Sequence, residues 1–224
     1  MRPFRRGFVA VGLAAAMVIG GAVPAMAAKK APEDPVLLVH GYRGSPSTWA
    51  DMIANFAAKG RTAVAIDLAS EDNVVNARAI EAFVAAKGWG RVDIVAQSMG
   101  GLSARYFIKF LKPSVVDTYT GIGVPQYGIT ATCLLPGWYG GQMCPYGSFL
   151  RNLNSGDDTP GSVYWTTIYS RTDGYVSTSA SRLDGGACHV YEDPGVGHNA
   201  MDNDPTIFKH VLAAVDRTCV GTFK

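Results

Sequence analysis

The sequence predicts an α/β domain with a mostly parallel sheet that is covered by helices on both faces. Short apolar runs alternate three times with segments of helical period between residues 36 and 111, and their connections are only a few residues long. The chain has 224 residues, 48% of them apolar, with a mean hydropathy of +0.10. This length and composition suit one domain with a full core and exclude a disordered chain.

The first half of the chain supplies three strand–helix pairs. The unbroken apolar run at residues 36–39 lies between Pro35 and Gly41 and is too short for a helix, so a strand buried on both faces is expected. The next segment has apolar residues at helical spacing, with Ser47 as its expected cap. By the same reasoning, strands are expected at 36–39, 62–66 and 92–96, and helices at 47–58, 73–87 and 102–111.

The alternation stops at residues 121–161, which are rich in Gly, Pro, Asn, Asp and Tyr. An ordered surface excursion without a strand or a long helix is expected there. Two β-branched and aromatic runs, at 163–169 and 188–191, predict two more strands. The last helix is expected to start at Asn203 or Asp204, with Pro205 in its first turn, and to end near Arg217.

Residues 1–27 have the pattern of an export signal. Three arginines precede an apolar stretch that ends in Ala25-Met26-Ala27, a small-x-small cleavage pattern, so a mature secreted domain of residues 28–224 is expected. The stretch contains several glycines and ends at a cleavage site, which argues against a stable membrane anchor. Without the three arginines the chain has 17 basic against 18 acidic residues, so a nucleic-acid partner is not expected.

All four cysteines lie in the expected mature domain, and an even number in an exported protein suggests disulfides. Three pairings are possible. Loop closure favours Cys133–Cys144 across a Gly/Pro-rich segment and Cys188–Cys219 between a late strand and the C-terminal region. No metal site is expected, because neither the cysteines nor the four histidines have a ligand spacing.

Ser98 lies in a turn suited to a nucleophile. The segment Ala96-Gln97-Ser98-Met99-Gly100-Gly101 follows an expected buried strand and opens an expected helix, which is the context of a nucleophile elbow. Small residues two positions before and after the serine let backbone segments pass closely, and Ala96 and Gly100 meet that need. The helix N-terminus favours an oxyanion. The alternative is a loop in which Ser98 only caps the helix.

A second turn, His40-Gly41-Tyr42-Arg43-Gly44, directly follows the first expected strand. Its glycines allow the backbone to approach a substrate, so the backbone N–H groups of Tyr42 and Met99 are the expected oxyanion donors. His40 precedes the serine and lies at a strand end. We therefore expect it to be a structural hydrogen-bonding residue and not the catalytic base.

An acid and a histidine follow the serine in chain order. Asp173 comes just after the strand expected at 163–169, and His198 lies between the last expected strand and the last helix. Both loops lie at the carboxyl ends of strands, where ligands bind in such sheets, so Ser98, Asp173 and His198 are expected to meet there. The alternatives are an Asx-turn for Asp173 and an ordinary loop position for His198.

Five motifs together resemble a known family: Val39-His40-Gly41, residues 92–101, Thr167-Ile168-Tyr169-Ser170 before Asp173, residues 181–185, and Gly195-Val196-Gly197-His198. They look like the small secreted bacterial triacylglycerol lipases of lipase class 2, including minimal Bacillus-type enzymes with Ala-x-Ser-x-Gly. The similarity spans about residues 35–215. It implies a single-domain minimal α/β-hydrolase that cleaves acyl esters through an acyl-enzyme, without a cofactor. It also implies Ser98 as nucleophile, His198 as base, Asp173 as orienting acid, and Tyr42 and Met99 as oxyanion donors.

Residues 123–156 depart from the smallest members of that family by inserting a longer, cysteine-bearing segment. We expect either a wall of the acyl cleft or a stapled surface loop remote from the site. An apolar acyl surface is expected from Tyr42, Trp49, Met99, Leu134, Leu135, Trp138 and Tyr139.

The predicted function is that of a monomeric secreted lipase or esterase, acting on a small-molecule or lipid ester, with a lipid–water interface as one place of action. A polyester or cutin-type hydrolase and an acyltransferase could use the same residues. A non-catalytic binding protein has no reason to keep the serine turn, the histidine and the acid together.

Overall fold

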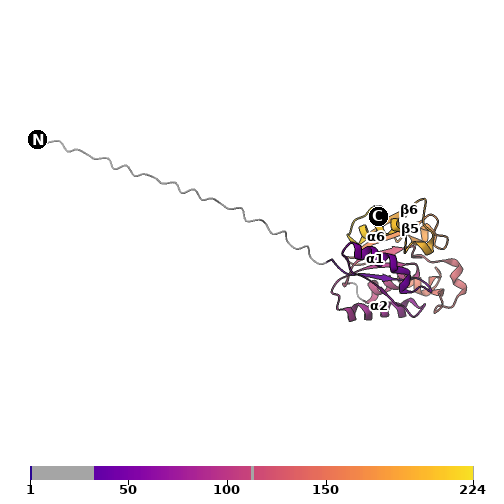
Figure 1. Cartoon of the computed structure of the whole chain (residues 1–224). Coiled ribbons are helices and arrows are strands. Elements are labelled where there is room, and N and C mark those ends of the chain that lie inside the picture. Colours follow the sequence, from indigo (N-terminus) through magenta and orange to yellow (C-terminus); the bar gives the residue numbers. More distant parts are fainter. Residues whose placement is uncertain (2–32, 112–113, 224) are drawn as a thin grey trace. The chain divides into compact units, whose positions relative to one another are not determined.

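A seven-stranded sheet with the order β2-β1-β3-β4-β5-β6-β7 forms the centre of the protein (Figure 1). The structure is a computed structural model that describes residues 1, 33–111 and 114–223, so residues 2–27 of the predicted export signal and its cleavage site lie outside the described residues. All neighbouring strands are parallel except β6 and β7. The strands are β1 (Val36–Val39), β2 (Ala63–Ile66), β3 (Val92–Gln97), β4 (Val116–Ile122), β5 (Tyr164–Ser170), β6 (Ala187–Glu192) and β7 (Thr222–Phe223).

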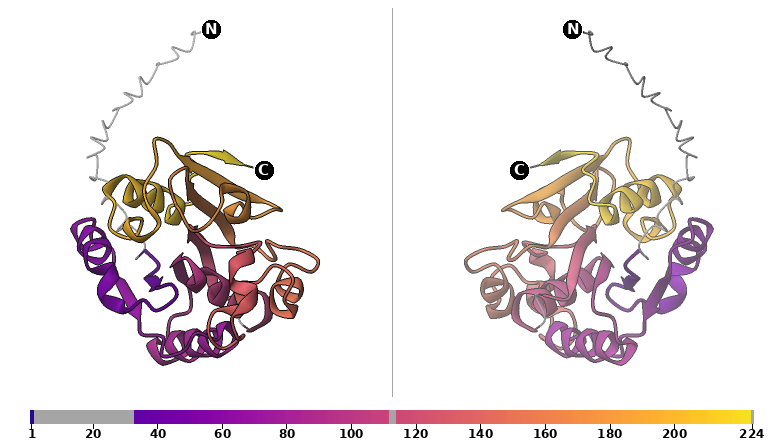
Figure 2. Two further views of the ribbon diagram at one scale, coloured as in Figure 1. Left: turned by 90° about the vertical axis from the view of Figure 1, so that its right-hand side faces the viewer. Right: turned by 90° about the vertical axis from the view of Figure 1, so that its left-hand side faces the viewer.

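Helices cover both faces of the sheet, as predicted (Figures 1 and 2). They are α1 (Ala50–Ala58), α2 (Asn73–Lys87), α3 (Met99–Tyr106), α4 (Ser148–Leu153), α5 (Thr178–Ser181) and α6 (Pro205–Val215). Strand β1 shows how one strand serves two cores: Val36 and Leu38 pack with residues of α1 and α6, whereas Leu37 and Val39 pack with residues of α2 and α3. The two-residue period of a strand therefore explains why the whole run is apolar.

Helix ends follow the sequence signals in two cases. Helix α2 spans the predicted residues, and the Asp72 side chain caps it by accepting hydrogen bonds from the N–H groups of Val74 and Val75. Helix α6 begins at Pro205, and the Asp204 carboxylate caps it by accepting hydrogen bonds from the N–H groups of Thr206 and Ile207. It ends at Val215, two residues before the predicted end.

Three sequence expectations are wrong in detail. The first helix does not use Ser47 as a cap, because a 3-10 turn at Pro46–Trp49 precedes α1. The third helix begins at Met99 and not at Leu102, so its first turn lies directly at Ser98. Strand β4 was not predicted from the sequence, because its alternation of Thr and Asp with apolar residues lacks the apolar run of the other central strands.

The segment that was expected to have no strand or long helix, residues 121–161, contains the end of β4, two 3-10 turns and the six-residue helix α4. Both predicted disulfides are present, Cys133–Cys144 within this segment and Cys188–Cys219 between β6 and the chain that follows α6. Among the described residues, no helix has the length and apolar character needed to span a membrane.

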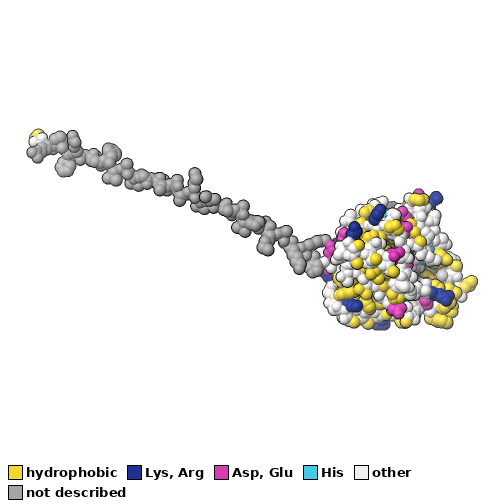
Figure 3. All heavy atoms as spheres, in the orientation of Figure 1, with side chains coloured by type: hydrophobic (Ala, Val, Ile, Leu, Met, Phe, Trp, Pro, Cys, Tyr) yellow, Lys and Arg dark blue, Asp and Glu magenta, His cyan; other side chains and the backbone are white. Residues whose placement is uncertain are grey.

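Charged side chains on the described surface are mixed in sign. On the face drawn in Figure 3, Lys and Arg side chains are interspersed with Asp and Glu. Several of them pair, as Arg91 does with Asp34 at 3.0 Å and Arg217 with Asp117 at 2.6 Å. This distribution agrees with the balanced charge of the sequence.

Candidate active site

Ser98 lies between the end of β3 and the first residue of α3, in a backbone conformation with φ 53° and ψ −134°. A positive φ is uncommon for a residue other than glycine and marks a strained turn. The turn is held by a hydrogen bond from the Ser98 N–H to the carbonyl of Ile122 in β4, 3.0 Å. Gly100 is required beside it, because a Cβ there would lie 2.2 Å from the carbonyl oxygen of His40.

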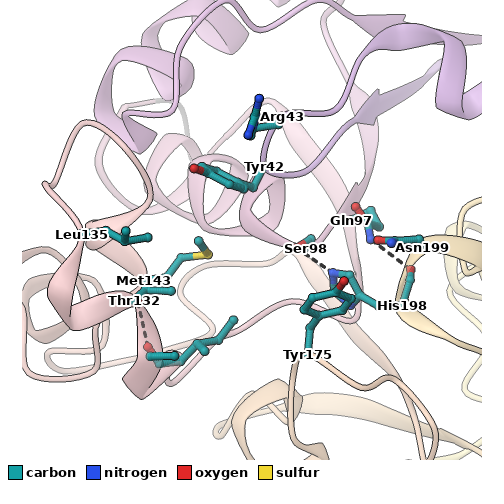
Figure 4. A pocket seen from close by; sticks show the side chains of 12 residues that line it. Tyr42, Arg43, Gln97, Ser98, Thr132, Leu135, Met143, Tyr175, His198 and Asn199 are labelled. Carbon is teal, nitrogen blue, oxygen red and sulfur yellow. Dashed lines mark hydrogen bonds between the residues drawn. The ribbon is translucent and has the colours of Figure 1, made fainter.

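Hydrogen bonds join Ser98, His198 and Asp173 in a line, and Figure 4 shows the contact between Ser98 and His198. The hydroxyl Oγ of Ser98 lies 2.9 Å from Nε2 of His198, and Nδ1 of His198 lies 2.8 Å from Oδ2 of Asp173. All three residues are buried, with exposed fractions below 9%. The residues that were predicted to meet come together at the carboxyl edge of the sheet.

The Asp173 carboxylate makes contacts with both of its oxygens. Oδ1 accepts hydrogen bonds from the backbone N–H groups of Tyr175 (2.9 Å) and Val176 (2.6 Å), while Oδ2 faces His198. The Asx-turn that the sequence left as an alternative is therefore present together with the histidine contact. The turn orients the carboxylate.

The two expected oxyanion donors flank the serine. Met99 is the first residue of α3, where backbone N–H groups have no acceptor within the helix. Tyr42 follows Gly41, whose added Cβ would lie 2.7 Å from Cβ of Ser98, so the backbone of this turn passes against the serine. Both residues lie where the sequence predicted them.

His40 lies apart from the line of hydrogen bonds that ends at Ser98. Its Nε2 accepts a hydrogen bond from the Leu68 N–H (3.1 Å), which leaves Nδ1 as the donor to the carbonyl of Gly41 (3.0 Å). The ring thus ties the end of β1 to the segment after β2. These hydrogen bonds agree with the structural role that the sequence predicted for His40.

A cavity of about 440 Å³ opens beside Ser98 and His198 (Figure 4). On one side it is lined by the segment that was predicted as a wall, through Ile129, Ala131, Thr132, Leu135 and Met143. Tyr42, which was expected on the acyl surface, lines it as well. Of the two alternatives that the sequence left open for this segment, the structure favours the wall, because residues within 129–143 line the cavity and do not lie remote from it.

Most of the other residues expected on the acyl surface do not line this cavity. Trp49 is fully buried in the core between the sheet and α6, because the 3-10 turn directs it under the sheet. Met99, the first residue of α3, packs in a buried cluster with Leu102 and Val124 and is 2% exposed. Leu134 and Trp138 point to solvent, and Tyr139 packs edge-on against Tyr42 outside the cavity lining. These residues lie in an irregular segment, where the sequence has no period that would show which side chains face inward.

The wall segment is anchored to the helices behind it. The buried Arg105 of α3 donates hydrogen bonds to Gln126 (3.1 Å) and Asn154 (2.9 Å), one at each end of the segment. In its middle, Gln142 accepts from the side chain of Asn73 and donates to Asp72, both at the start of α2. With the disulfide Cys133–Cys144, these contacts give the wall a fixed position.

The sequence profile of the Alpha/beta hydrolase family matches residues 36–183, which cover more than half of the chain. The chain belongs to the alpha/beta hydrolase family. The match includes Ser98 and Asp173 and ends before His198.

Solved structures of other hydrolases have a similar fold. Lipase B of Aspergillus fumigatus is 20% identical with a TM-score of 0.71, covering 85% of this chain and 54% of its own, so this chain spans about half the length of that protein. The mature form of the Bacillus licheniformis lipase BlEst2 is 18% identical with a TM-score of 0.69, covering 83% and 94%. The Bacillus subtilis carboxylesterase CesB is 15% identical with a TM-score of 0.56, covering 82% and 84%.

Sequence reasoning missed the polar side of the candidate site. Gln97 and Asn199, the chain neighbours of Ser98 and His198, line the cavity, and Gln97 donates to the backbone carbonyl of His198 (3.2 Å). Asp202 is buried nearby. Burial raises the pKa of Asp202 above its ordinary value, although hydrogen bonds, including that to Thr48, and the nearby His198 oppose the rise. Gln97 and Asn199 could have been found from the sequence, because they are the chain neighbours of Ser98 and His198. The sequence contains no comparable signal for Asp202.

Three carboxylates, Asp34, Asp93 and Asp117, come together at the opposite edge of the sheet, where β1, β3 and β4 begin. Arg61 and Arg91 pair with them, with Arg61 Nη2 at 2.7 Å from Asp93 and Arg91 Nε at 3.0 Å from Asp34. The arginines supply the positive charge that a metal ion would bring. These carboxylates are explained as an ion-pair network.

Proposed function

We propose that this hydrolase is a secreted serine esterase of the lipase type, which cleaves carboxylic esters, acylglycerols among them, through an acyl-enzyme. The observation that carries the proposal is the 2.9 Å contact between Ser98 Oγ and His198 Nε2, with Asp173 on the other ring nitrogen. A serine paired in this way can be deprotonated as it attacks a carbonyl carbon.

The proposed reaction has two halves. In the first, Ser98 Oγ bonds to the ester carbonyl carbon while His198 takes the hydroxyl proton, and the protonated ring then gives that proton to the departing alcohol. In the second, His198 takes a proton from water, whose oxygen bonds to the acyl carbon. The protonated ring then gives that proton to Ser98 Oγ as the bond from Oγ to the carbon breaks, which releases the carboxylic acid and the free serine. Asp173 stabilises the imidazolium in both halves.

The negative oxygen of each tetrahedral intermediate needs donors that are fixed before the reaction. The backbone N–H groups of Tyr42 and Met99 are proposed for this, supported by their positions on either side of Ser98. One such donor contributes about 2.7–4 kcal/mol to the stability of the transition state. No cofactor takes part in this mechanism.

The acyl chain is proposed to lie in the cavity along Leu135, Met143 and Ile129, since these side chains give it an apolar wall. The structural neighbours, two lipases and a carboxylesterase, support an acyl ester as substrate. A polyester hydrolase or an acyltransferase would use the same residues. Comparing rates on soluble, emulsified and polymeric esters separates these activities.

Export is proposed from the pattern of residues 1–27 and is supported by the two disulfides, which persist in oxidising compartments. The secreted protein is expected to begin at or near Ala28. N-terminal sequencing of protein recovered from the culture medium tests this, and a retained segment of residues 1–27 contradicts it.

The proposed hydrolase is tested by release of butyrate from a soluble ester, with two serine variants. Ser98→Ala removes the nucleophile and should abolish turnover, whereas Ser47→Ala changes an exposed serine and should keep it. A folded Ser98→Ala variant that hydrolyses the ester at the wild-type rate contradicts the proposal.

A further inference from the structure

Ser98 separates two surfaces of different chemistry. In Figure 4 the side chains of Leu135 and Met143 lie to one side of the serine, and Gln97 and Asn199 lie to the other. A bound ester has two parts that leave the carbonyl carbon in different directions, the acyl chain and the alcohol. The two surfaces therefore offer different environments to the two parts.

The polar side continues into a second cavity of about 230 Å³. It shares Tyr42, Arg43, Gln97 and Asn199 with the first cavity, so the two adjoin along this strip next to the serine. Its remaining side chains are those of Thr48 and Asp202. Apart from Tyr42 and two glycines, the described lining of this cavity is polar.

Asp202 is the buried acidic group of this lining, with an exposed fraction of 7%. Its described partners are its own backbone N–H, the side chain of Thr48 and Nδ2 of Asn203, the last at 3.3 Å from Oδ1, and it also interacts electrostatically with His198. A carboxylate has about four acceptor sites, so these contacts leave capacity for hydroxyl groups of a ligand. A ligand hydroxyl that donates a hydrogen bond to this buried carboxylate would offset part of the cost of burying it.

The charges of the cavity indicate which ligand suits it. Arg43, whose side chain is exposed, lies at the lining together with Asp202, so neither sign of charge prevails. A neutral ligand with several hydroxyl groups matches this combination of acceptors and donors. An alkyl group matches it poorly, because it would leave buried polar groups without partners.

We propose that this second cavity binds the leaving alcohol and selects alcohols that carry additional hydroxyl groups, with Asp202 as the specificity residue. The inference rests on the proposed ester hydrolase and names the alcohol half of its substrate. The acyl half occupies the first cavity, and the ester carbonyl lies at Ser98 between the two.

Two butyrate esters with the same three-carbon alcohol skeleton test the proposal, 1-monobutyrin with two free hydroxyl groups and propyl butyrate with none. Both give the same butyryl-enzyme, and kcat/KM reports only the steps up to its formation. The ratio of the two kcat/KM values, measured below the solubility of each ester, therefore isolates recognition of the alcohol. The wild-type protein should prefer 1-monobutyrin by about tenfold or more.

Variants on the alcohol side and on the acyl side of Ser98 should differ in their effect on this ratio of kcat/KM values. Asp202→Asn keeps the shape of the side chain but removes its charge and should lower the ratio several-fold, since hydrogen bonds to a charged acceptor are the stronger ones. Thr48→Val, which is close in shape, should lower it as well. Leu135→Ala, on the acyl side, should change the rates on both esters by the same factor and leave the ratio unchanged.

The outcomes distinguish the inference from the function on which it rests. Hydrolysis of both esters with a ratio near one, or a ratio that Asp202→Asn and Thr48→Val leave unchanged in folded protein, overturns the alcohol site and leaves the hydrolase intact. Hydrolysis of neither ester overturns both. If Asp202→Asn does not fold, the wild-type ratio and the ratio of the Thr48→Val variant still show whether the second cavity selects the alcohol.

Discussion

Asp173 and His198 are bound to each other twice, once through their side chains and once through their backbones. Nδ1 of His198 lies 2.8 Å from Oδ2 of Asp173, and the N–H of His198 donates to the carbonyl of Asp173 at 3.0 Å. The loop after β5 and the loop after β6 are thereby fixed to each other. The imidazole is held with Nε2 toward Ser98, which is the orientation that the proposed base requires.

Ser98 and His198 should act as one unit. Ser98→Ala and His198→Ala are each expected to lower kcat by about 10⁴-fold or more, and the double variant by little more than either, because each change alone removes the attacking serine alkoxide. Steady-state kinetics on a soluble butyrate ester measure this. If the loss of kcat in the double variant equals the product of the two single losses, Ser98 and His198 do not act as one unit.

Asp173→Asn should fold and turn over about 10⁴-fold more slowly, since an amide can hold the imidazole in the wrong tautomer. The matched control is Asp193→Asn, at an exposed acid after β6 that pairs with Arg171 at 3.4 Å. It should keep wild-type kcat. Circular dichroism and kcat on the same samples test both, and an inactive Asp193 variant beside an active Asp173 variant means that the acid is wrongly assigned.

The central strands were predictable because a strand buried on two faces needs apolar residues throughout, and β1 meets this condition at every position. Strand β4 was not, because it buries polar residues, and one of them has its partner on another strand: Thr118 donates its hydroxyl hydrogen to Asp93 of β3 at 2.7 Å. Such a pair becomes visible only once the strands are side by side.

The serine, the acid and the histidine could be placed from the sequence because each follows a strand in the expected order. The polar cavity could not, because Thr48 and Asp202 are far apart in the chain and meet only through the fold. Likewise, Leu135 lines the cavity while Trp138 is exposed, and the contacts of Arg105 and Gln142 that hold this irregular segment join residues that are far apart in the sequence.

The position of Leu135 predicts an effect on acyl length. Leu135→Ala should lower kcat/KM for an octanoate ester relative to an acetate ester by roughly tenfold, because one or two methylenes lose contact and each buried CH₂ contributes about 0.8 kcal/mol. Trp138→Ala is the control, since Trp138 is 69% exposed and does not line the cavity. A chain-length effect of Trp138→Ala that equals that of Leu135→Ala contradicts this acyl site.

Asp93 should make stability depend on pH. Burial raises the pKa of Asp93 to about 7, although the Thr118 hydroxyl and Arg61 oppose the rise. The folded protein then holds this proton more tightly than the unfolded chain, so the stability it contributes is present below pH 3.8 and is lost as the pH rises through about 7. The loss amounts to at most roughly 4 kcal/mol.

Urea unfolding of the wild type and of Asp93→Asn across this pH range measures that contribution. The free energy of unfolding of the wild type should fall relative to that of the variant as the pH rises. A wild type that gains stability over the variant with rising pH means that Arg61 holds Asp93 charged throughout.

The central claim, that Ser98 is the nucleophile of a hydrolase, is tested most directly by covalent labelling with a fluorophosphonate. Phosphorus bonds to the serine oxygen and fluoride leaves, and mass spectrometry of the peptides locates the adduct. We predict one adduct, on Ser98, that is absent from Ser98→Ala and forms far more slowly in His198→Ala. A folded wild-type protein that takes no label at Ser98, or takes it at another serine, contradicts the account.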